Sequence, residues 1–342
     1  MRTIDWEPEK NNIVMIDQTL LPRECRIIEC STIDCLCEAI IKLRVRGAPA
    51  LGAAGGFSVA LAAQRSKAAT LDGMMKDIEA AGRTIISTRP TAVNLSWGVK
   101  RVLNALEDAK NVKEVRLFAL DEAKAIADED VEKNMELGKY GASLLEDGDT
   151  VMTHCNAGRL ACVDWGTALG VIRSARAQGK DIKVISCETR PLNQGSRITT
   201  WELMEDKIPV TLITDSMSGH VMRKGMVDKV IVGADRITQD AVFNKIGTYT
   251  HSVIAKEHEV PFYVAAPVST FDFERMEDEI EIELRKPDEL KFFGNHQIAP
   301  LDVEVYNPAF DATPMEYVSA IITENGVFYP PFLLEEVKIR VK

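Results

Sequence analysis

Residues 150–158 read Thr-Val-Met-Thr-His-Cys-Asn-Ala-Gly, a short apolar run that ends in polar and small residues. Further runs of the same kind follow, rich in valine and isoleucine and separated by segments of helix length. They are Lys183–Ser186, Val210–Ile213, Val230–Gly233 and Phe262–Ala265. Strands that alternate with helices indicate βαβ units and a parallel sheet covered on both faces. The sequence therefore predicts an α/β protein with a C-terminal Rossmann-like domain that contains a parallel sheet.

The chain before this region has a different pattern. From Thr32 to about Leu145 the apolar residues recur at helical spacing, and the uncharged stretch from Gly47 to Gln64 is interpreted as a buried helix. An acidic turn, Glu146-Asp147-Gly148-Asp149, follows. We therefore expect a mainly helical N-terminal domain over residues 1–146 and a Rossmann-like catalytic domain over residues 147–342.

Composition limits the function. The 342 residues include 41 Lys plus Arg and 52 Asp plus Glu, which gives a net charge of −11, and 46% are hydrophobic. With no basic block, nucleic acid is not an expected partner. Pro49 and several glycines interrupt the longest uncharged stretch, so no membrane span is expected. The acidic N-terminus does not resemble a signal peptide, and an odd set of seven cysteines suits reduced thiols, so we expect a cytoplasmic protein.

Ligands of parallel sheets bind beyond the carboxyl ends of the strands, so the residues after each run are candidates for chemistry. Cys155 follows the first run, at a turn into a helix, where a thiol can act as thiolate, base or nucleophile. The alternative is a buried, inert cysteine, which is our interpretation of Cys162 and Cys187. Gln194 lies in the polar loop after the second run. Asp215 and two serines follow the third, where we expect an aspartate or a serine to cap a helix rather than to form a Ser-His-Asp triad.

Asp235 follows the fourth run, with Asn244 and Lys245 shortly beyond it. A carboxylate at a strand tip combined with an Asn-Lys pair at a helix start provides an acid and an anchor for phosphate or hydroxyl groups. The alternative is an ion pair between Asp235 and Arg236. Both interpretations stay open on the residues alone.

In the first domain, two arginines stand beside predicted helix starts. Arg46-Gly47-Ala48 precedes the small-residue helix, and Arg89 precedes another. An arginine beside free helix amides suits a phosphate, although a surface arginine at such a place is usually only solvated. Only the two together, with the cysteine and the aspartate, indicate a site.

Common sequence motifs for nucleotide and metal binding are missing from the chain. There is no G-x-G-x-x-G after a strand and no P-loop, so no dinucleotide is expected. The Cys35-x-Cys37 pair and the His154-Cys155 pair lack partners at ligand spacing, so no metal is expected either. We predict that the protein uses no cofactor.

Taken together, these motifs resemble the methylthioribose-1-phosphate isomerases. The resemblance runs through nearly the whole chain in order. It rests on Val45–Ala50, Arg89–Leu95, Thr153–Gly158, Gly166–Gly170, Glu188–Pro191, Gly233–Ile237, Asn244–Tyr249, Pro261–Pro267 and Asn307–Asp311. The wider superfamily of aldose–ketose isomerases includes regulatory subunits of eukaryotic translation initiation factor 2B and archaeal ribose-1,5-bisphosphate isomerases.

The resemblance implies a function, a site and an assembly. The implied reaction converts 5-methylthioribose 1-phosphate to 5-methylthioribulose 1-phosphate in methionine salvage, in a homodimer with an N-terminal helical domain that includes a small sheet. The implied catalytic pair is Cys155 and Asp235. The implied substrate-binding residues are Arg46, Gly47, Ala48, Arg89, Gln194, Asn244 and Lys245.

The expected mechanism starts from a furanose whose anomeric oxygen carries phosphate, so its ring cannot open without acid help. Asp235 is expected to be that acid, with its pKa raised by apolar walls and limited water, and Cys155 a base or a transition-state stabiliser. A hydrogen then moves from C2 to C1 as a proton or as a hydride. The alternatives are an isomerase of 5-deoxyribose 1-phosphate or ribose 1,5-bisphosphate, and a non-catalytic regulatory subunit like those of initiation factor 2B.

Overall fold

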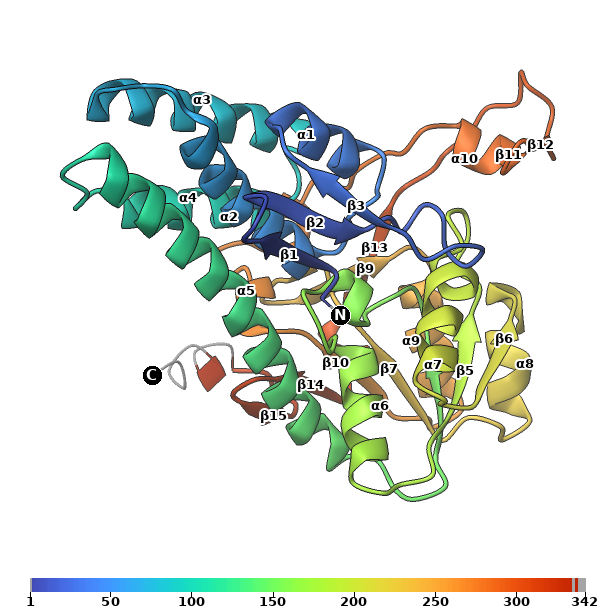
Figure 1. Ribbon diagram of the computed structural model, residues 1–342. Coiled ribbons are helices and arrows are strands. Elements are labelled where there is room, and N and C mark those ends of the chain that lie inside the picture. The colour runs from blue at the N-terminus through green and yellow to red at the C-terminus, as the bar shows by residue number, and fades with distance from the viewer. Residues whose placement is uncertain (1, 334–335, 338–342) are drawn as a thin grey trace. The chain divides into compact units, whose positions relative to one another are not determined.

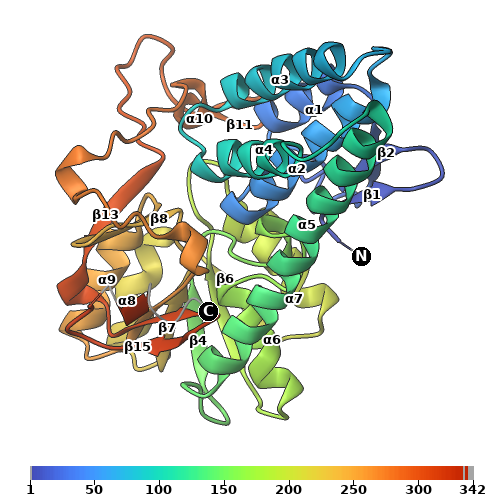
Figure 2. The same cartoon turned by 90° about the vertical axis from the view of Figure 1, so that its left-hand side faces the viewer.

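The computed structural model describes residues 2–333 and 336–337, and the contacts within the chain divide it into two units (Figures 1 and 2). The first unit comprises Met1–Met135 with Gly158–Gly166. The second comprises Glu136–Ala157 with Thr167–Lys342. The boundary expected between residues 146 and 147 remains a prediction.

The first unit is mainly helical and begins with a small antiparallel sheet, as expected. The strands are β1 (Ile4–Glu7), β2 (Asn12–Ile16) and β3 (Ile27–Cys30), and the helices are α1 (Ile33–Ile41), α2 (Ala48–Arg65), α3 (Leu71–Thr88), α4 (Val93–Ala105) and α5 (Val112–Ala142), the last of which continues into the second unit. Threonines start two of these helices. The hydroxyl of Thr32 accepts the N–H of Cys35, and that of Thr70 accepts the N–H of Gly73. Each satisfies an amide that the helix itself leaves unpaired.

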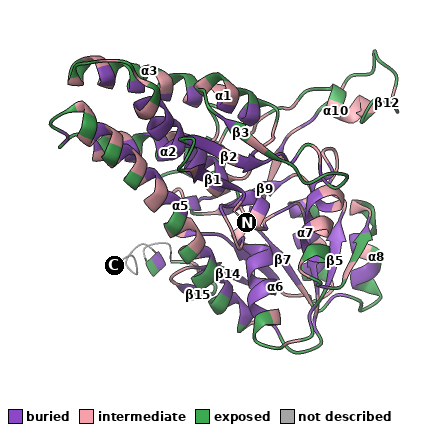
Figure 3. Ribbon diagram, in the orientation of Figure 1, coloured by how far each residue is buried: buried purple, intermediate pink, exposed green. Residues whose placement is uncertain are grey.

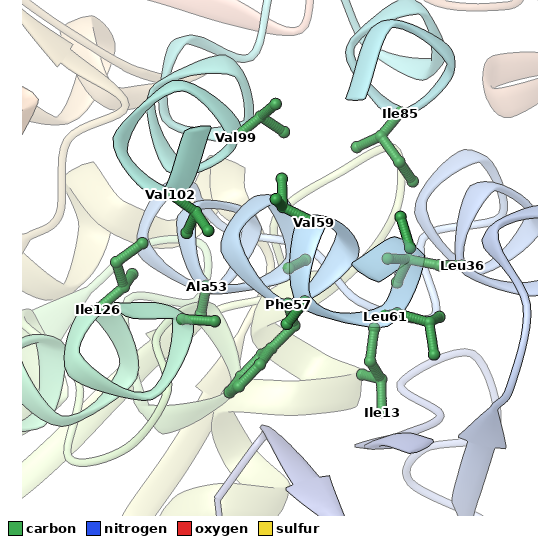
Figure 4. Close-up of a cluster of buried hydrophobic side chains, with 14 of the residues drawn as sticks. Ile13, Leu36, Ala53, Phe57, Val59, Leu61, Ile85, Val99, Val102 and Ile126 are labelled. Carbon is green, nitrogen blue, oxygen red and sulfur yellow. The ribbon is translucent and has the colours of Figure 1, made fainter. Parts of the chain in front are cut away.

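Helix α2 is the centre of the first unit and is buried along nearly its whole length, as its uncharged sequence predicts. Figure 4 shows Phe57 and Leu61 of this helix among apolar side chains from the surrounding elements. Phe57 has no exposed surface. Burying a side chain of this kind contributes about 1.5–3 kcal/mol to folding.

Helices α2 and α4 pack with their backbones in close approach, and they run parallel. A Cβ added to Gly98 would lie 2.0 Å from the carbonyl oxygen of Gly52, so only glycine fits there. Gly52 faces Asn94 and Gly98, whereas Gly56 faces Gly98 and Val102, so the contacts advance in the same direction along both helices. The N-termini of α2 and α4 therefore lie at the same end of the pair.

The second unit contains the predicted Rossmann-like sheet. Its strand order is β15-β14-β10-β7-β4-β5-β6. The parallel strands are β4 (Thr150–Thr153), β5 (Lys183–Cys187), β6 (Val210–Ile213), β7 (Lys229–Val232), β10 (Phe262–Ala265) and β14 (Ala320–Thr323), and β15 (Gly326–Phe328) adds an antiparallel edge. Numbered along the chain, the parallel strands have the order 3-2-1-4-5-6 that is typical of doubly wound dinucleotide-binding folds.

Apolar side chains alternate between the two faces of this sheet. In β4, Val151 joins one cluster and Met152 the other, and Val184 and Ile185 divide in the same way in β5. Helices α6 (Ala168–Ala177) and α7 (Thr200–Glu205) contribute to one cluster, and α8 (Ser218–Arg223) and α9 (Thr248–Glu257) to the other. Strands β5 and β7 are accordingly drawn as buried in Figure 3. Both faces are covered, as parallel sheets require.

A second, smaller antiparallel sheet follows β7. It consists of β8 (Arg236–Ile237), β9 (Ala241–Lys245) and β13 (Phe310–Pro314). The remaining short elements are α10 (Asp288–Lys291), β11 (Phe292–Phe293) and β12 (His296–Gln297). Across residues 2–333 and 336–337, no helix has the length and apolar character needed to cross a membrane.

Candidate active site

The strand order brings the ends of β4 and β7 together. These strands are parallel neighbours, with Val151 opposite Lys229, and Cys155 and Asp235 lie just beyond their carboxyl ends. The chain proceeds from β4 to β5 on one side and returns to β7 on the other, so the sheet changes winding direction here. In open α/β sheets this switch point is where ligands bind.

The backbone of Cys155 is held in an unusual conformation. Its φ is +66°, in the left-handed region that residues other than glycine rarely adopt. Its N–H donates to the hydroxyl of Thr189 at 2.8 Å, and its carbonyl oxygen accepts from the hydroxyl of Thr199 at 2.6 Å. The thiol-bearing residue is half-buried. Two threonines from the segment after β5 therefore hold the peptide groups on both sides of the thiol.

Thr189 is itself held in a strained conformation. Its φ is +67°, and it is fully buried. Its N–H and that of Arg190 donate to the two carboxylate oxygens of Asp215, at 2.8 and 2.7 Å. Asp215 thus bonds to the neighbouring loop, and Thr214 rather than Asp215 is the residue that precedes the helical turn after β6. The expectation that an aspartate or a serine caps a helix here is wrong, because neither helical segment after β6 has a side-chain cap and the loop amides after β5 occupy the Asp215 carboxylate.

Asp235 links β7 to the small sheet. Its N–H donates to the carbonyl oxygen of Phe243 in β9 at 2.8 Å, and its side chain is exposed. The protein alone does not surround this carboxyl with apolar walls. The raised pKa that the expected mechanism needs therefore remains a prediction, and bound substrate would have to exclude water from the carboxyl.

Gln194 lies at the end of the loop after β5, directly before a π-helical turn over Gly195–Thr199. The residue is buried, and its Oε1 atom has no hydrogen-bond partner within the described part of the chain. An unpaired buried acceptor is costly, and a hydroxyl donor from a ligand would satisfy it. This is an independent reason to place a polar ligand near the loop.

Asn244 and Lys245 are consecutive in β9 and are both buried. The side-chain amide of Asn244 donates to the hydroxyl of Thr248 at 3.1 Å, whereas the Lys245 Nζ atom donates to the carbonyl of Ala309 at 2.8 Å. Successive side chains of a strand leave on opposite faces. The two residues therefore do not present their side chains in the same direction.

The N-terminus of α9, which follows this pair, is already occupied. The carboxylate of Asp311 accepts the N–H of Gly247 at 2.7 Å and that of Tyr249 at 3.3 Å. Burial raises the pKa of Asp311 to about 6, against the effect of these amides. A negative carboxylate at this helix terminus leaves no open anion site there. The amides of Gly247 and Tyr249 are therefore already bonded within the chain.

The first unit places Arg46 and Arg89 close to the paired N-termini of α2 and α4. Gly47 is the N-cap residue of α2 with φ +92°, and a Cβ there would lie 2.3 Å from the carbonyl oxygen of Ala161. Ala48 is the first residue of that helix, and Arg89 follows α3, three residues before Ala92 caps α4. Amides at the starts of two parallel helices, beside two arginines, are the kinds of groups that bind a phosphate, so the phosphate site expected here stays a prediction.

The residues that sequence reasoning missed act through other side chains. Thr189 and Thr199 hold Cys155, and Asp215 holds Thr189, but each pair is far apart in sequence. Positions after successive parallel strands share one sheet edge, so that rule would have gathered the segments without identifying the bonds. His154 and His251, described below, were missed for the same reason.

Comparison with known proteins identifies a family. The profile of the initiation factor 2 subunit family matches residues 44–330. A protein of Methanosarcina acetivorans, provisionally named a methylthioribose-1-phosphate isomerase, is 68% identical over 99% of this chain and 97% of its own length.

Two solved structures resemble the whole chain. One is 5-methylthioribose 1-phosphate isomerase from Pyrococcus horikoshii, with a TM-score of 0.93 and 44% identity, covering 99% of this chain and 95% of that one. The other is described as subunit delta of translation initiation factor eIF-2B from A. fulgidus, with a TM-score of 0.91 and 60% identity over 99% of both chains. The two descriptions differ in function, and the fold is the same.

Proposed function

This chain belongs to the initiation factor 2 subunit family, and we propose that it is an aldose–ketose isomerase that converts 5-methylthioribose 1-phosphate to 5-methylthioribulose 1-phosphate. The observation that carries the proposal is the placement of Cys155 and Asp235 beyond neighbouring strands at the switch point. Full-length similarity to a solved isomerase supports the same substrate.

The reaction is balanced without a co-reactant. The ring oxygen gains a proton as its bond to C1 breaks, one hydrogen moves from C2 to C1, and the C2 hydroxyl loses its proton to become a carbonyl. One carbon is oxidised while its neighbour is reduced, so the net change is internal to the sugar. We assign proton donation at the ring oxygen to Asp235, and to Cys155 the role of base or transition-state stabiliser at C2.

The remaining site residues would bind and orient the sugar. We assign the phosphate to Arg46, Arg89 and the amides of Gly47 and Ala48. Charge-assisted hydrogen bonds to a phosphate are roughly twice as strong as neutral ones. Fixing the phosphate and the hydroxyls makes the hydrogen transfer effectively intramolecular.

We assign the hydroxyl groups of the sugar to residues of the second unit. Gln194 offers its unpaired buried oxygen as an acceptor. Asn244 and Lys245 provide a side-chain amide and a cation, and because they leave β9 on opposite faces, we expect removal of one to affect binding more than removal of the other.

The test is a substrate panel followed by NMR detection of the ketose, with Cys155→Ser and Asp235→Asn as variants. We expect each variant to keep its fold and lose turnover by roughly 100-fold or more, because proton-transfer chemistry and not core volume is removed. Cys25→Ser, at an exposed cysteine, is the matched control for the thiol. Near-native turnover in either folded variant would remove that residue from the mechanism.

A non-catalytic regulatory role is the second candidate, because one solved relative is described as an initiation factor subunit. Cys155 and Asp235 would have no use in a subunit that only binds sugar phosphates or nucleotides. If the chain binds the sugar phosphate tightly but yields no ketose over prolonged incubation, the regulatory role replaces the enzymatic one.

The C5 end of the substrate distinguishes the remaining isomerase alternatives. Ribose 1,5-bisphosphate carries a second dianion there, which would need further cationic donors, whereas a methylthio or methyl group needs an apolar wall. We propose preference for the 5-methylthio or 5-deoxy sugar, in a cytoplasmic homodimer. Preferential consumption of the bisphosphate from a mixture would overturn the substrate and keep the reaction class.

A further inference from the structure

Four side chains of types that bind metal ions meet in a cluster that includes His154, the residue before Cys155. His154 follows β4, Cys187 ends β5, Asp215 follows β6, and His251 lies in α9. One donor atom from each residue lies within 4.8 Å of those of the other three. Imidazole nitrogen, thiolate sulfur and carboxylate oxygen are the ligand types that Zn²⁺ takes in proteins.

The spacing suits a tetrahedral ion. Zinc lies about 2.0–2.2 Å from nitrogen or oxygen and about 2.3 Å from sulfur, so its ligand atoms stand roughly 3.3–3.6 Å apart. The His154 Nδ1 atom is 3.1 Å from the His251 Nε2 atom and 3.7 Å from the Asp215 Oδ1 atom. Rotamer adjustments of about an ångström at the widest pair would complete the shell.

The atoms around the cluster orient its ligands. The Nε2 atom of His154 lies 2.9 Å from the carbonyl oxygen of Ile246, so Nε2 carries the proton and Nδ1 presents a lone pair to the cluster. The Asp215 carboxylate is fixed by the two loop amides described above. A second hydrogen bond that fixes the tautomer and orientation of each ligand is typical of protein metal sites.

The imidazole of His251 can change its tautomer without losing another hydrogen bond. The Nε2 atom of His251 lies 3.1 Å from the Nδ1 atom of His154 and donates to it, whereas the Nδ1 atom of His251 has no hydrogen-bond partner among residues 2–333 and 336–337. Moving the ring proton to Nδ1 therefore breaks no other hydrogen bond and exposes the Nε2 lone pair. Burial also keeps both rings neutral, lowering the pKa of His154 to about 4 and that of His251 to about 3.

We propose that His154, Cys187, Asp215 and His251 bind one zinc ion. Binding displaces the thiol proton of Cys187 to solvent, and the resulting thiolate and the carboxylate neutralise the ion. Four protein ligands make a closed site, whose role is structural rather than catalytic. The ion would join the ends of β4, β5 and β6 to α9, beside Cys155.

This site departs from the sequence-based expectation that no metal binds. That expectation rests on the spacing of ligands along the chain and treats Cys187 as inert. The four ligands come from four elements that only the fold brings together.

The experiment measures metal directly. The untagged full chain is purified without chelator, dialysed against zinc, freed of unbound ion and analysed by plasma mass spectrometry, and a cobalt-loaded sample is examined for a thiolate-to-cobalt charge-transfer band. We expect about one ion per chain and a visible band. Cys187→Ser and His251→Asn should each lower zinc affinity by about tenfold or more.

Matched variants separate loss of a ligand from a general effect of the substitution. Cys162→Ser removes another buried thiol, and His220→Asn removes an exposed histidine on α8. Both should bind zinc and cobalt as the natural chain does. Circular dichroism of each variant identifies any that fails to fold.

Two results would overturn the proposal. One is a folded natural chain with no retained zinc and no cobalt band, which needs no variant to interpret. The other is full zinc binding in both Cys187→Ser and His251→Asn. Neither readout depends on turnover, so failure here leaves the proposed isomerase activity untouched, and loss of that activity leaves the metal site untouched.

Discussion

Replacement of Thr189 by valine should reduce catalysis much more than it changes the volume of the site. The hydroxyl of Thr189 accepts the N–H of Cys155 at 2.8 Å and lies 3.1 Å from the carbonyl oxygen of Cys187, to which it donates. Valine keeps the branched shape and loses both bonds. The Cys155 amide is then left without its acceptor, at a backbone conformation that costs energy to maintain.

The size of the effect follows from these contacts. An unsatisfied buried donor costs about 1–3 kcal/mol, which is comparable to the strain of a left-handed residue other than glycine. The Cys155 loop can therefore relax, and a shift of about 1 Å in a catalytic group lowers the rate by about 100-fold. We expect kcat to fall roughly 10- to 100-fold while KM changes by less than about threefold.

The assay is steady-state turnover of 5-methylthioribose 1-phosphate, with urea unfolding of the same preparations. Thr189→Ser keeps the hydroxyl and removes the branch, so it should retain kcat within about threefold. Thr250→Val, at an exposed threonine of α9, is the control for the substitution itself. A folded Thr189→Val variant with natural kcat would show that these hydrogen bonds do not position Cys155.

Two further predictions concern the first unit. Arg46→Ala and Arg89→Ala should each raise KM by about 10-fold or more with a smaller change in kcat. The reason is that charge-assisted hydrogen bonds to the phosphate, worth about 1.5–3 kcal/mol, exist before the transition state. Arg83→Ala, at an exposed arginine, is the control and should change neither constant. Burial raises the pKa of Asp130 to about 7, and this carboxyl accepts the N–H of Val163 at 2.7 Å. Its folded pKa lies above the unfolded one, so its contribution to stability is present below about pH 4 and is lost as the pH rises towards 7. Urea unfolding at several pH values should show that Asp130→Asn removes this dependence, and an identical pH profile in both proteins would contradict the assignment.

The parallel strands β4, β5, β6, β7 and β10 were predictable because each is a short apolar run rich in valine and isoleucine or in aromatic residues, whereas β14 was not predicted. The expected Val210–Ile213 and Phe262–Ala265 coincide with β6 and β10. The small antiparallel sheet of the second unit was not predicted, because β9 is stabilised by pairing with β13, where Asn244 lies opposite Asp311. A strand whose partner lies so far along the chain carries little signal of its own.

The candidate site also has parts that the sequence predicts and parts that it does not. The positions of Cys155 and Asp235 beyond β4 and β7 were predictable because both follow strand-forming runs. The roles of Thr189, Asp215 and His251 were not, because each acts on a residue from another strand. Spacing along the chain cannot report a hydrogen bond or a ligand set that parallel strands assemble.

The strain at this sheet edge is itself an argument for function. Glycine adopts a positive φ at little cost, whereas a branched residue there is a true outlier. Thr189 nevertheless occupies this conformation at φ +67°, and Cys155 does so at +66°. Glycine would supply neither the Thr189 hydroxyl that accepts the Cys155 N–H nor the Cys155 thiol. The strain is therefore best explained as the cost of holding two side chains that the site requires, with the Asp215 carboxylate offsetting part of it through the Thr189 amide.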